Sequence, residues 1–383
     1  MKNLIYLDHA AATPMDRRVF DAMQPYFIEL FFNPSSPYLP AVSVHRDYEA
    51  AKRTLANLIG GKPGEVIMTA GATESINLAF TGVGGHVVVA NIEHPAVLSC
   101  AKNMEHTIIA ADKSGIISAE AVKSAITPKT RLVSVALANN ELGTIQSLRD
   151  IAAVVRSERE ARLVRGDDTP IYFHSDASQG VGQLDVNVAR LGVDMLTLNA
   201  GKMYGPKQVG LLWAASFVRL SPQIFGGGQE RGLRSGTENV AGVVGFARAL
   251  ELAVEHRKFE SDRLAKLRDY LQSVLVDAFP NAVVSGHQKH RLSGHLHISF
   301  PGIDGERLVF LLENCGVLVA TGSACAANKA AKSHVLDAIG MSDELAGGSI
   351  RITLGHLSDE KDTKLAGRIL VKAINSEYSR IAK

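Results

Sequence analysis

The stretch EVIMTAGATESINLAFTGV, residues 65–83, changes from the pattern of a strand to that of a helix within a few residues. Its first part, EVIMTA (65–70), is a short apolar run of the length of a buried strand. From Thr73 onward the apolar side chains recur at helical spacing. A strand that leads directly into a helix is the repeating unit of a sheet covered by helices on both faces. The stretch therefore predicts an α/β fold.

The same alternation continues along the chain. Further apolar runs of strand length occur at HVVVAN (86–91), RLVSVALA (131–138), IYFHSD (171–176), DMLTLN (194–199) and VGLLWAA (209–215). Helical spacing follows some of them, as in HPAVLSCAKNM (94–104) and LRDIAAVVRSERE (148–160). A long helical stretch, roughly 240–275, leads into a region from about residue 293 that mixes strands and helices, and Ser358 is expected to cap the last helix. The sequence thus predicts an α/β domain followed by a smaller α+β unit.

The composition excludes several classes of protein. The chain has 383 residues, 46% of them hydrophobic, which suits two domains rather than one small core. Its 41 basic and 39 acidic residues give a formal net charge of +2, so we expect no direct binding to nucleic acid or to an anionic membrane. No run approaches the roughly 18 apolar residues of a membrane span, and the N-terminus lacks the apolar run of a signal peptide. We therefore expect a cytoplasmic protein.

The cysteines and histidines give no sign of a disulfide framework or a metal site. Cys100 lies in the apolar pattern AVLSCAK and Cys315 ends the helix-like run LVFLLENC, so both are expected to pack. Cys325 stands alone among small residues in TGSACAANKAAKS, as a reactive thiol or an incidental loop residue would. The absence of a CxxC pair favours a reducing compartment. His295 and His297 would share one strand face, but no third ligand is nearby, so we expect surface residues and no metal.

Polar side chains follow five of the predicted strands, and parallel strands would bring them to one edge of the sheet. GATES (71–75) opens a helix after the first strand, so its free N–H groups and the Thr73 hydroxyl can bind an anion. The later strands are followed by His94 in EHPA, by NNELG (139–143), by Asp176 and Gln179 in HSDASQ, and by Lys202 in NAGKMYGPK. Taken singly, each has an ordinary explanation: a helix cap, a turn residue or a solvated lysine.

An anion site, a carboxylate, a flat imidazole and a lysine together form the set that pyridoxal phosphate requires. The helix start holds its phosphate, the carboxylate keeps the ring nitrogen protonated, and the lysine binds it covalently. A nicotinamide enzyme would instead show GxGxxG after the first strand, a context that FGGGQERG (225–232) lacks, and no GxxxxGK[ST] phosphate loop occurs. The combination therefore predicts a pyridoxal-phosphate enzyme.

Ten motifs occur in the order found in cysteine desulfurases: YLDHAAATP, NPSSP, GATES, EHPAV, NNELG, HSDASQGVGQ, GKMYGPKQVG, GGGQERGLRSGTEN, TGSAC and IRITLG. From about residue 4 to beyond residue 355 the chain resembles this group of class V aminotransferase-like enzymes, which have fold type I of the pyridoxal-phosphate enzymes. The resemblance implies a large domain over 16–255 with a mainly parallel seven-stranded sheet, and a small α+β domain over 256–383 that carries the cysteine loop. Residues 1–15 would form an arm that joins the small domain.

The resemblance also implies roles for residues at the predicted sheet edge. Lys202 resembles the lysine that forms the Schiff base with the cofactor and moves the Cα proton, and His94 resembles the imidazole stacked on the cofactor ring. Asp176 resembles the partner of the ring nitrogen, and Gln179 the residue that hydrogen-bonds the ring hydroxyl. The remaining cofactor contacts would come from Ala72, Thr73, Asn140, Asn199 and, reaching into the other subunit of a homodimer, Thr237.

The implied reaction converts L-cysteine to L-alanine and transfers the sulfur to Cys325 as a persulfide. The substrate carboxylate would be held by Asn33, Asn140 and Arg351, the last as a bidentate clamp. The persulfide would serve iron–sulfur cluster assembly, tRNA thiolation or both, through an iron–sulfur scaffold or another acceptor protein. A loop of small residues suits a thiol that must enter the site and carry sulfur out.

Three positions depart from the family's pattern. Gly201 replaces the usual histidine before the lysine, Asn199 replaces a serine or threonine, and Tyr38 replaces the histidine that often follows NPSS. We expect the first change to weaken cofactor binding by roughly 1–3 kcal/mol unless another donor substitutes. Two alternatives stay open: another enzyme of this fold, such as a selenocysteine lyase or an aminotransferase, and a cofactor-poor scaffold or docking protein.

Overall fold

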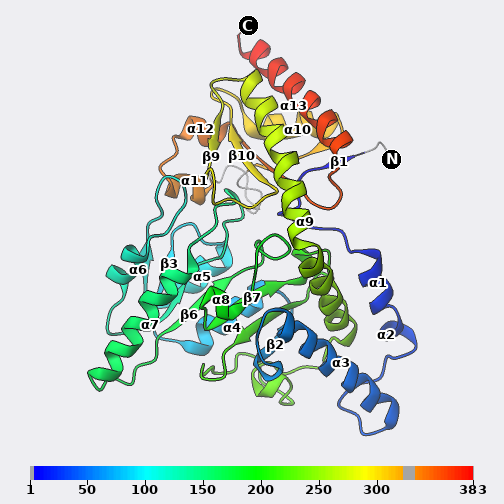
Figure 1. Ribbon diagram of the computed structural model, residues 1–383, viewed down its shortest axis with the longest axis vertical. Helices are drawn as coiled ribbons and strands as arrows, with labels where there is room; N and C mark the ends of the chain where they lie inside the picture. Colours follow the sequence, from blue (N-terminus) through cyan, green and yellow to red (C-terminus); the bar gives the residue numbers. More distant parts are fainter. Residues whose placement is uncertain (1–3, 322–332, 383) are drawn as a thin grey trace.

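The computed structural model describes residues 4–321 and 333–382. Its larger part is built on a seven-stranded sheet with the order β2-β8-β7-β6-β5-β3-β4 (Figure 1). Neighbouring strands pair in parallel except β8, which is antiparallel to both β2 and β7. The strands are β2 (Val66–Thr69), β3 (His86–Ala90), β4 (His106–Ile109), β5 (Thr130–Ser134), β6 (Tyr172–Asp176), β7 (Met195–Asn199) and β8 (Gly210–Ala214). The predicted α/β fold with a mainly parallel sheet is confirmed.

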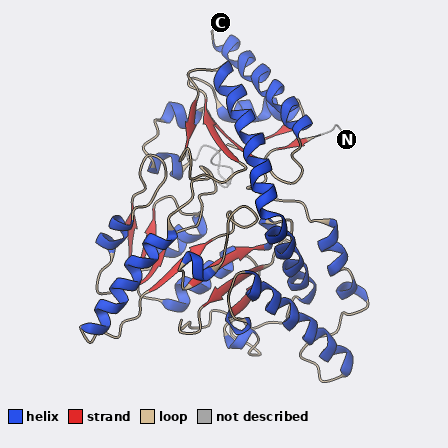
Figure 2. Ribbon diagram, viewed as in Figure 1, coloured by secondary structure: helices blue, strands red, loops and turns tan. Residues whose placement is uncertain are grey.

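Helices cover both faces of this sheet (Figure 2). Val88 belongs to one apolar cluster, whereas its neighbours Val87 and Val89 belong to another on the opposite face, as the alternation of side chains along a strand requires. Of the seven strands of this sheet, only the edge strand β4 is not predicted from an apolar run in the sequence. Its sequence HTII is only partly buried, and Ile108 is exposed. The helices of this part are α1 (Arg17–Met23), α2 (Pro25–Ile28), α3 (Leu39–Leu58), α4 (Ala72–Val83), α5 (Pro95–Lys102), α6 (Ala119–Ala125), α7 (Leu148–Val164) and α8 (Val188–Leu191).

A smaller part lies above the large sheet in Figure 1, and the long helix α9 (Val240–Ala278) runs from one part to the other. From Leu264 onward α9 packs in a separate apolar cluster, which also contains Ile5 and Leu7 of the N-terminal arm. Because α9 continues through residue 255, the domain boundary predicted there falls inside a helix and stays a prediction. The other elements of this part are β1 (Ile5–Tyr6) paired with β11 (Val317–Leu318), the antiparallel sheet of β9 (Val283–Ser285), β10 (His295–Ser299) and β12 (Ser349–Thr353), and the helices α10 (Gly305–Asn314), α11 (His334–Ala338), α12 (Asp343–Gly347) and α13 (Glu360–Ile381).

The predictions for the cap of the last helix and for the two histidines of β10 are wrong. The last helix, α13, is capped by Asp359 rather than by Ser358. His295 and His297 are buried, because β10 is the central strand of its sheet and His295 packs closely on Gly143 of the large part. Among the described residues, no group of three or more His, Cys, Asp or Glu side chains is arranged to hold a metal ion. None of the described helices has the length and apolar character needed to cross a membrane.

Candidate active site

A cavity of about 290 Å³ opens where the carboxyl ends of β3, β5, β6 and β7 come together. The N-terminal arm contributes Ala10 and Ala11 to its wall, and β12 contributes Arg351. The structure thus brings together most of the residues expected to form the site. The cavity is lined by Ala72, Thr73, His94, Asn140, Asp176, Gln179, Asn199, Lys202 and Arg351.

Lys202 follows β7 in a short 3-10 helix, and the N-terminal arm holds its amine. The Nζ of Lys202 donates to the carbonyl oxygens of Ala10 and Ala11, each at 2.7 Å. The Nε2 of Gln179 donates to the same Ala10 carbonyl at 3.2 Å. The arm therefore contacts two of the expected cofactor residues through its backbone. These contacts could not be predicted from the sequence, because every residue has a backbone carbonyl and the residue type does not indicate which carbonyl accepts a hydrogen bond.

His94 caps a helix and also lines the cavity, so both explanations of this residue hold together. Its Nδ1 accepts from the N–H of Ala96 at 3.1 Å, at the start of α5. Because Nδ1 accepts, the hydrogen of the neutral ring is on Nε2. Burial lowers the pKa of His94, although the nearby Asp176 carboxylate acts in the opposite direction. A neutral imidazole suits stacking on a flat ring.

Asp176 ends β6, and its Oδ1 accepts from the N–H of Ser178 at 2.9 Å, which fixes the carboxylate at the strand end. The anion-binding end of the cavity is the first turn of α4, which begins at Ala72 directly after Gly71, whose φ is +135°. Such a φ favours glycine, because a side chain there would be strained. The free N–H groups of this twelve-residue helix and the Thr73 hydroxyl are the groups available to an anion.

Arg351 is buried on β12 and already has two partners. One terminal nitrogen donates to Asp8 Oδ1 at 2.7 Å, and the other donates to the carbonyl oxygen of Asn140 at 3.2 Å. The Asp8 contact was not predicted, although Asp8 lies within the YLDHAAATP motif. It places a fixed negative charge beside the guanidinium that is expected to bind the substrate carboxylate.

Other expected residues lie elsewhere. Asn33 and Thr237 are exposed and do not line this cavity. Cys325 lies outside the described residues. Cys100 is buried as expected, whereas Cys315, the C-cap of α10, is exposed rather than packed.

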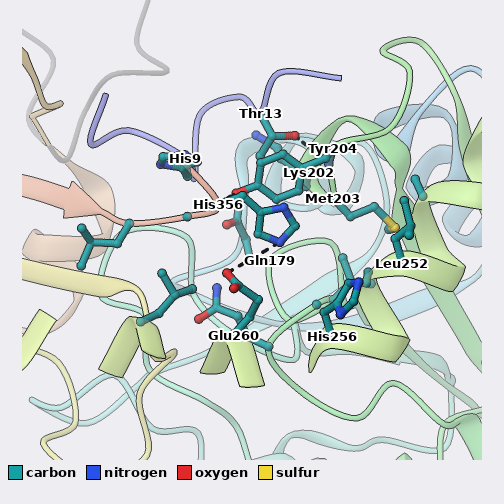
Figure 3. A pocket seen from close by; sticks show the side chains of 18 of the residues that line it. His9, Thr13, Gln179, Lys202, Met203, Tyr204, Leu252, His256, Glu260 and His356 are labelled. Atoms are coloured by element: carbon teal, nitrogen blue, oxygen red, sulfur yellow. Dashed lines mark hydrogen bonds and ion pairs between the residues drawn. The ribbon is translucent and has the colours of Figure 1, made fainter. Parts of the chain in front are cut away.

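Behind Lys202 lies a second, smaller cavity of about 60 Å³ (Figure 3). The linings of the two cavities share Ala10, Gln179 and Lys202, and the smaller cavity is bordered by α9 and by the turn after β12. The ring of His356 stacks on Tyr204 with centroids 3.8 Å apart, and its Nε2 lies 3.7 Å from Glu260 Oε2. The Nε2 of His9 is buried and has no hydrogen-bond partner among the described residues. The His356–Glu260 contact joins the turn after β12 to α9, and Thr13 Oγ1 of the arm accepts from the N–H of Tyr204 at 2.9 Å, two residues after Lys202.

The chain matches the family model of class-V aminotransferases over residues 5–365. It is 38% identical to "Cysteine desulfurase IscS" of Dictyoglomus turgidum, over 98% of this chain and 95% of the relative. It belongs to the cysteine desulfurase family. Another member, "Cysteine desulfurase IscS 1" of Archaeoglobus fulgidus, is 39% identical over 93% of each chain.

Solved structures agree with this assignment to the cysteine desulfurases. A structure described as "NIFS-LIKE PROTEIN" superposes with a TM-score of 0.88 at 32% identity, covering 97% of this chain and 99% of the other. "SspA in complex with cysteine" superposes with a TM-score of 0.78 at 33% identity, covering 91% of this chain and 98% of the other. The fold is therefore fold type I of the pyridoxal-phosphate enzymes.

Cysteine desulfurases use pyridoxal phosphate, and the residues of the larger cavity fit this group. A lysine amine, a strand-end carboxylate and a helix start are present in one cavity wall. Two residues of the same wall hold buried polar atoms, Ser178 Oγ and Arg351 Nε, that have no hydrogen-bond partner among the described residues. Buried polar atoms without partners are rare, so these atoms are available to a ligand.

Proposed function

We propose that this chain converts L-cysteine to L-alanine and collects the sulfur as a persulfide on Cys325. The observation that supports this most is the convergence of Lys202, Asp176 and Arg351 on one cavity. Pyridoxal phosphate, when bound, draws electrons from the substrate's Cα and so makes that carbon acidic. The remaining steps of the proposed reaction are assigned to side chains of this protein.

The cofactor would be held from three sides. The first turn of α4 and Thr73 would bind its phosphate, Lys202 would attach it covalently, and Asp176 would hydrogen-bond its ring nitrogen. Gln179 would donate to the ring hydroxyl, and the neutral His94 ring would pack against the cofactor ring. Ala72, Asn140 and Asn199 complete the wall.

Arg351 and Asn140 orient the substrate by its carboxylate, which places the Cα hydrogen near Lys202. Because the substrate amine would displace Lys202 from the cofactor, the Lys202 amine would then be able to take the Cα proton and later return it. The Cys325 thiolate attacks the substrate sulfur: a sulfur–sulfur bond forms, the Cβ–S bond breaks, and its electron pair stays on the carbon. Protonation of that carbon gives alanine, so no external oxidant or reductant is needed.

A homodimer is part of this proposal. Thr237 is exposed and lies outside its own cavity, as a residue that completes the partner's phosphate site would. Two large apolar side chains are exposed in the same regions of the chain as Asn33 and Thr237: Phe31 is 67% exposed and Phe225 is 80% exposed. Their exposure supports a subunit interface that would bury them. Asn33 would then act at the edge of an assembled dimer. We further propose a cytoplasmic location and delivery of the sulfur to an iron–sulfur scaffold or a tRNA-thiolation relay.

The test is to purify the protein, measure bound cofactor by its yellow absorbance, and follow alanine release from L-cysteine. Lys202→Ala is expected to lose covalent cofactor and all alanine formation. Mass spectrometry should find the extra sulfur on Cys325 in the wild type, in Cys100→Ser and in Cys315→Ser. Cys325→Ser should bind L-cysteine but carry no persulfide. Wild-type alanine release by Lys202→Ala, or a persulfide on Cys100 or Cys315 alone, would contradict the proposal.

A further inference from the structure

The first two residues after the segment that contains Cys325 are tied to the strand ends of the cavity. Ser333 Oγ donates to Glu141 Oε2 at 2.5 Å, and the Nε2 of His334 lies 2.9 Å from the carbonyl oxygen of Glu93. Because a carbonyl oxygen only accepts, His334 donates through Nε2. We call these four residues the α11 anchor, since Ser333 is also the N-cap of α11.

Both acidic members of the anchor are buried at the ends of strands that form the cavity. Glu141 is 5% exposed and follows β5, while Glu93 is 2% exposed and follows β3. The Oε1 of Glu93 accepts from the N–H of Ala136 at 2.9 Å, which joins the two strand ends directly. Burial raises the pKa of Glu141 to about 7, while the Ser333 hydrogen bond and Arg351 act in the opposite direction.

Asn139 makes the two attachment points one rigid unit. Its Nδ2 donates to the Ile92 carbonyl at 2.8 Å, and its Oδ1 accepts from the N–H groups of Glu141 and Leu142, both at 2.9 Å. A single buried side chain therefore fixes the spacing between the Glu93 carbonyl and the Glu141 carboxylate. The turn that contains Asn139 and Glu141 therefore both lines the cavity and holds the start of α11.

Apolar packing explains why α11 needs a polar anchor as well. Val335 and Leu336 are each 1% exposed and belong to the apolar cluster of the large part, together with Ile339. Apolar contacts are not directional, so they hold the helix against the core without fixing its position along the cavity rim. The hydrogen bonds of Ser333 and His334 are directional and supply that position.

We propose that Ser333 and His334 are positioning residues for sulfur transfer: their hydrogen bonds to the Glu141 carboxylate and the Glu93 carbonyl fix the start of α11, whose N-cap Ser333 comes eight residues after Cys325 in the sequence. This inference rests on the proposed function, because the persulfide on Cys325 reports on it. It assigns to Glu141 and to the Glu93 backbone a role outside cofactor and substrate binding.

The chain offers a matched control for the main variant. Ser342 is the N-cap of α12, its hydroxyl accepts from the N–H of Leu345 at 3.4 Å, and α12 has five residues like α11. Ser333 caps in the same way, with the N–H of Leu336 at 3.2 Å, and differs by its bond to Glu141. Ser333→Ala and Ser342→Ala therefore lose the same kind of cap, and only the first loses the anchor.

The holoenzyme of each variant is mixed with L-cysteine and quenched, and the persulfide on Cys325 is measured by mass spectrometry over a single turnover. We expect Ser333→Ala to form it at least tenfold more slowly with an unchanged cofactor content. Ser342→Ala should match the wild type. Ser333→Thr, which keeps the hydroxyl, should recover most of the rate, and His334→Gln should retain more of it than His334→Phe.

A second readout needs neither cofactor nor turnover. Amide hydrogen exchange across α11 should become faster in Ser333→Ala than in the wild type, and Ser342→Ala should not change it. A wild-type persulfide rate in Ser333→Ala, or a loss of bound cofactor in that variant, would overturn the positioning role. If the wild type forms no persulfide on Cys325, the proposed function fails, and unchanged exchange across α11 in Ser333→Ala would then overturn the anchor too.

Discussion

Asp8 Oδ1 lies 2.7 Å from a terminal nitrogen of Arg351, so a carboxylate of the N-terminal arm already contacts the guanidinium proposed to bind substrate. The Arg351 side chain is 3% exposed and that of Asp8 is 18% exposed, so water screens this pair weakly. The pair stabilises a buried cation, and it also places a negative charge beside the site of an incoming substrate carboxylate. One substitution of Asp8 can measure its effect on stability and its effect on substrate binding separately.

Asp8→Asn is expected to lower the KM for L-cysteine by about three- to tenfold, because like charges no longer face each other. The same change should reduce the free energy of unfolding by about 1–3 kcal/mol, because the buried guanidinium loses its counter-charge. Steady-state kinetics and chemical denaturation measure the two effects. Cysteine methyl ester, which lacks the carboxylate charge, is the control substrate and should show little change in KM. An unchanged or higher KM for L-cysteine would show that Asp8 helps substrate binding instead.

Asp176→Asn should fold normally and lose turnover by at least tenfold, or about 1.4 kcal/mol in the barrier. Asparagine keeps the shape of the side chain and can still accept from the Ser178 N–H, but it lacks the charge that keeps the ring nitrogen protonated. Alanine release measures the rate, and circular dichroism checks the fold. Asp262→Asn, at an exposed position, is the control. A loss smaller than tenfold would remove Asp176 from the proposed role.

The strand ends explain why so much of the cavity could be predicted from the sequence. His94, Asp176 and Lys202 each directly follow a buried strand or lie within a few residues of its end, and parallel strands bring such positions to one edge. Local periodicity was therefore enough to group residues that are more than a hundred positions apart.

Contacts between segments that are far apart in the sequence could not be predicted from local periodicity. The carbonyl oxygens that accept from Lys202 belong to Ala10 and Ala11, and the presence of an alanine in the sequence does not predict what its backbone will bind. His295 and His297 read as surface residues because a polar strand face normally meets water, but here another part of the chain covers it. The burial of Glu93 likewise depends on how the strand ends pack.

Glu93 predicts a specific pH dependence of stability. Burial raises its pKa to about 8 from an ordinary value of 4.5, so between these pH values the folded protein keeps a proton that the unfolded chain has lost. The folded state then binds more protons, and the free energy of unfolding falls as the pH rises, by up to about 1.4 kcal/mol per pH unit. Glu93→Gln lacks this ionisation and can still accept from the Ala136 N–H.

The stability of Glu93→Gln relative to the wild type should therefore increase steadily from pH 5 to pH 8. Chemical denaturation at unit steps of pH measures the difference, which cancels the titration of all other groups. Glu120→Gln, at an exposed position, serves as the control and should show a flat difference. A flat difference for Glu93→Gln would mean that the Glu93 carboxylate is already ionised in the folded protein.

Gly201 is the departure from the family pattern that a single substitution can test. A Cβ placed on Gly201 would lie 3.4 Å from Asn199 Oδ1 and 3.6 Å from Lys207 Cγ, so a Cβ at this position makes ordinary van der Waals contacts. The N–H of Gly201 donates to Asn199 Oδ1 at 3.0 Å, and Asn199, which lines the cavity, also has an amide nitrogen that can donate to a ligand. Gly201→His should add a donor to the cavity and tighten cofactor binding by about 1–3 kcal/mol, or roughly five- to 150-fold. Dialysis against cofactor-free buffer compares the yellow absorbance retained over time, and Gly201→Ala controls for filling the space. Equal retention by all three proteins would show that Asn199 or another donor already supplies the contact that the histidine makes elsewhere in the family.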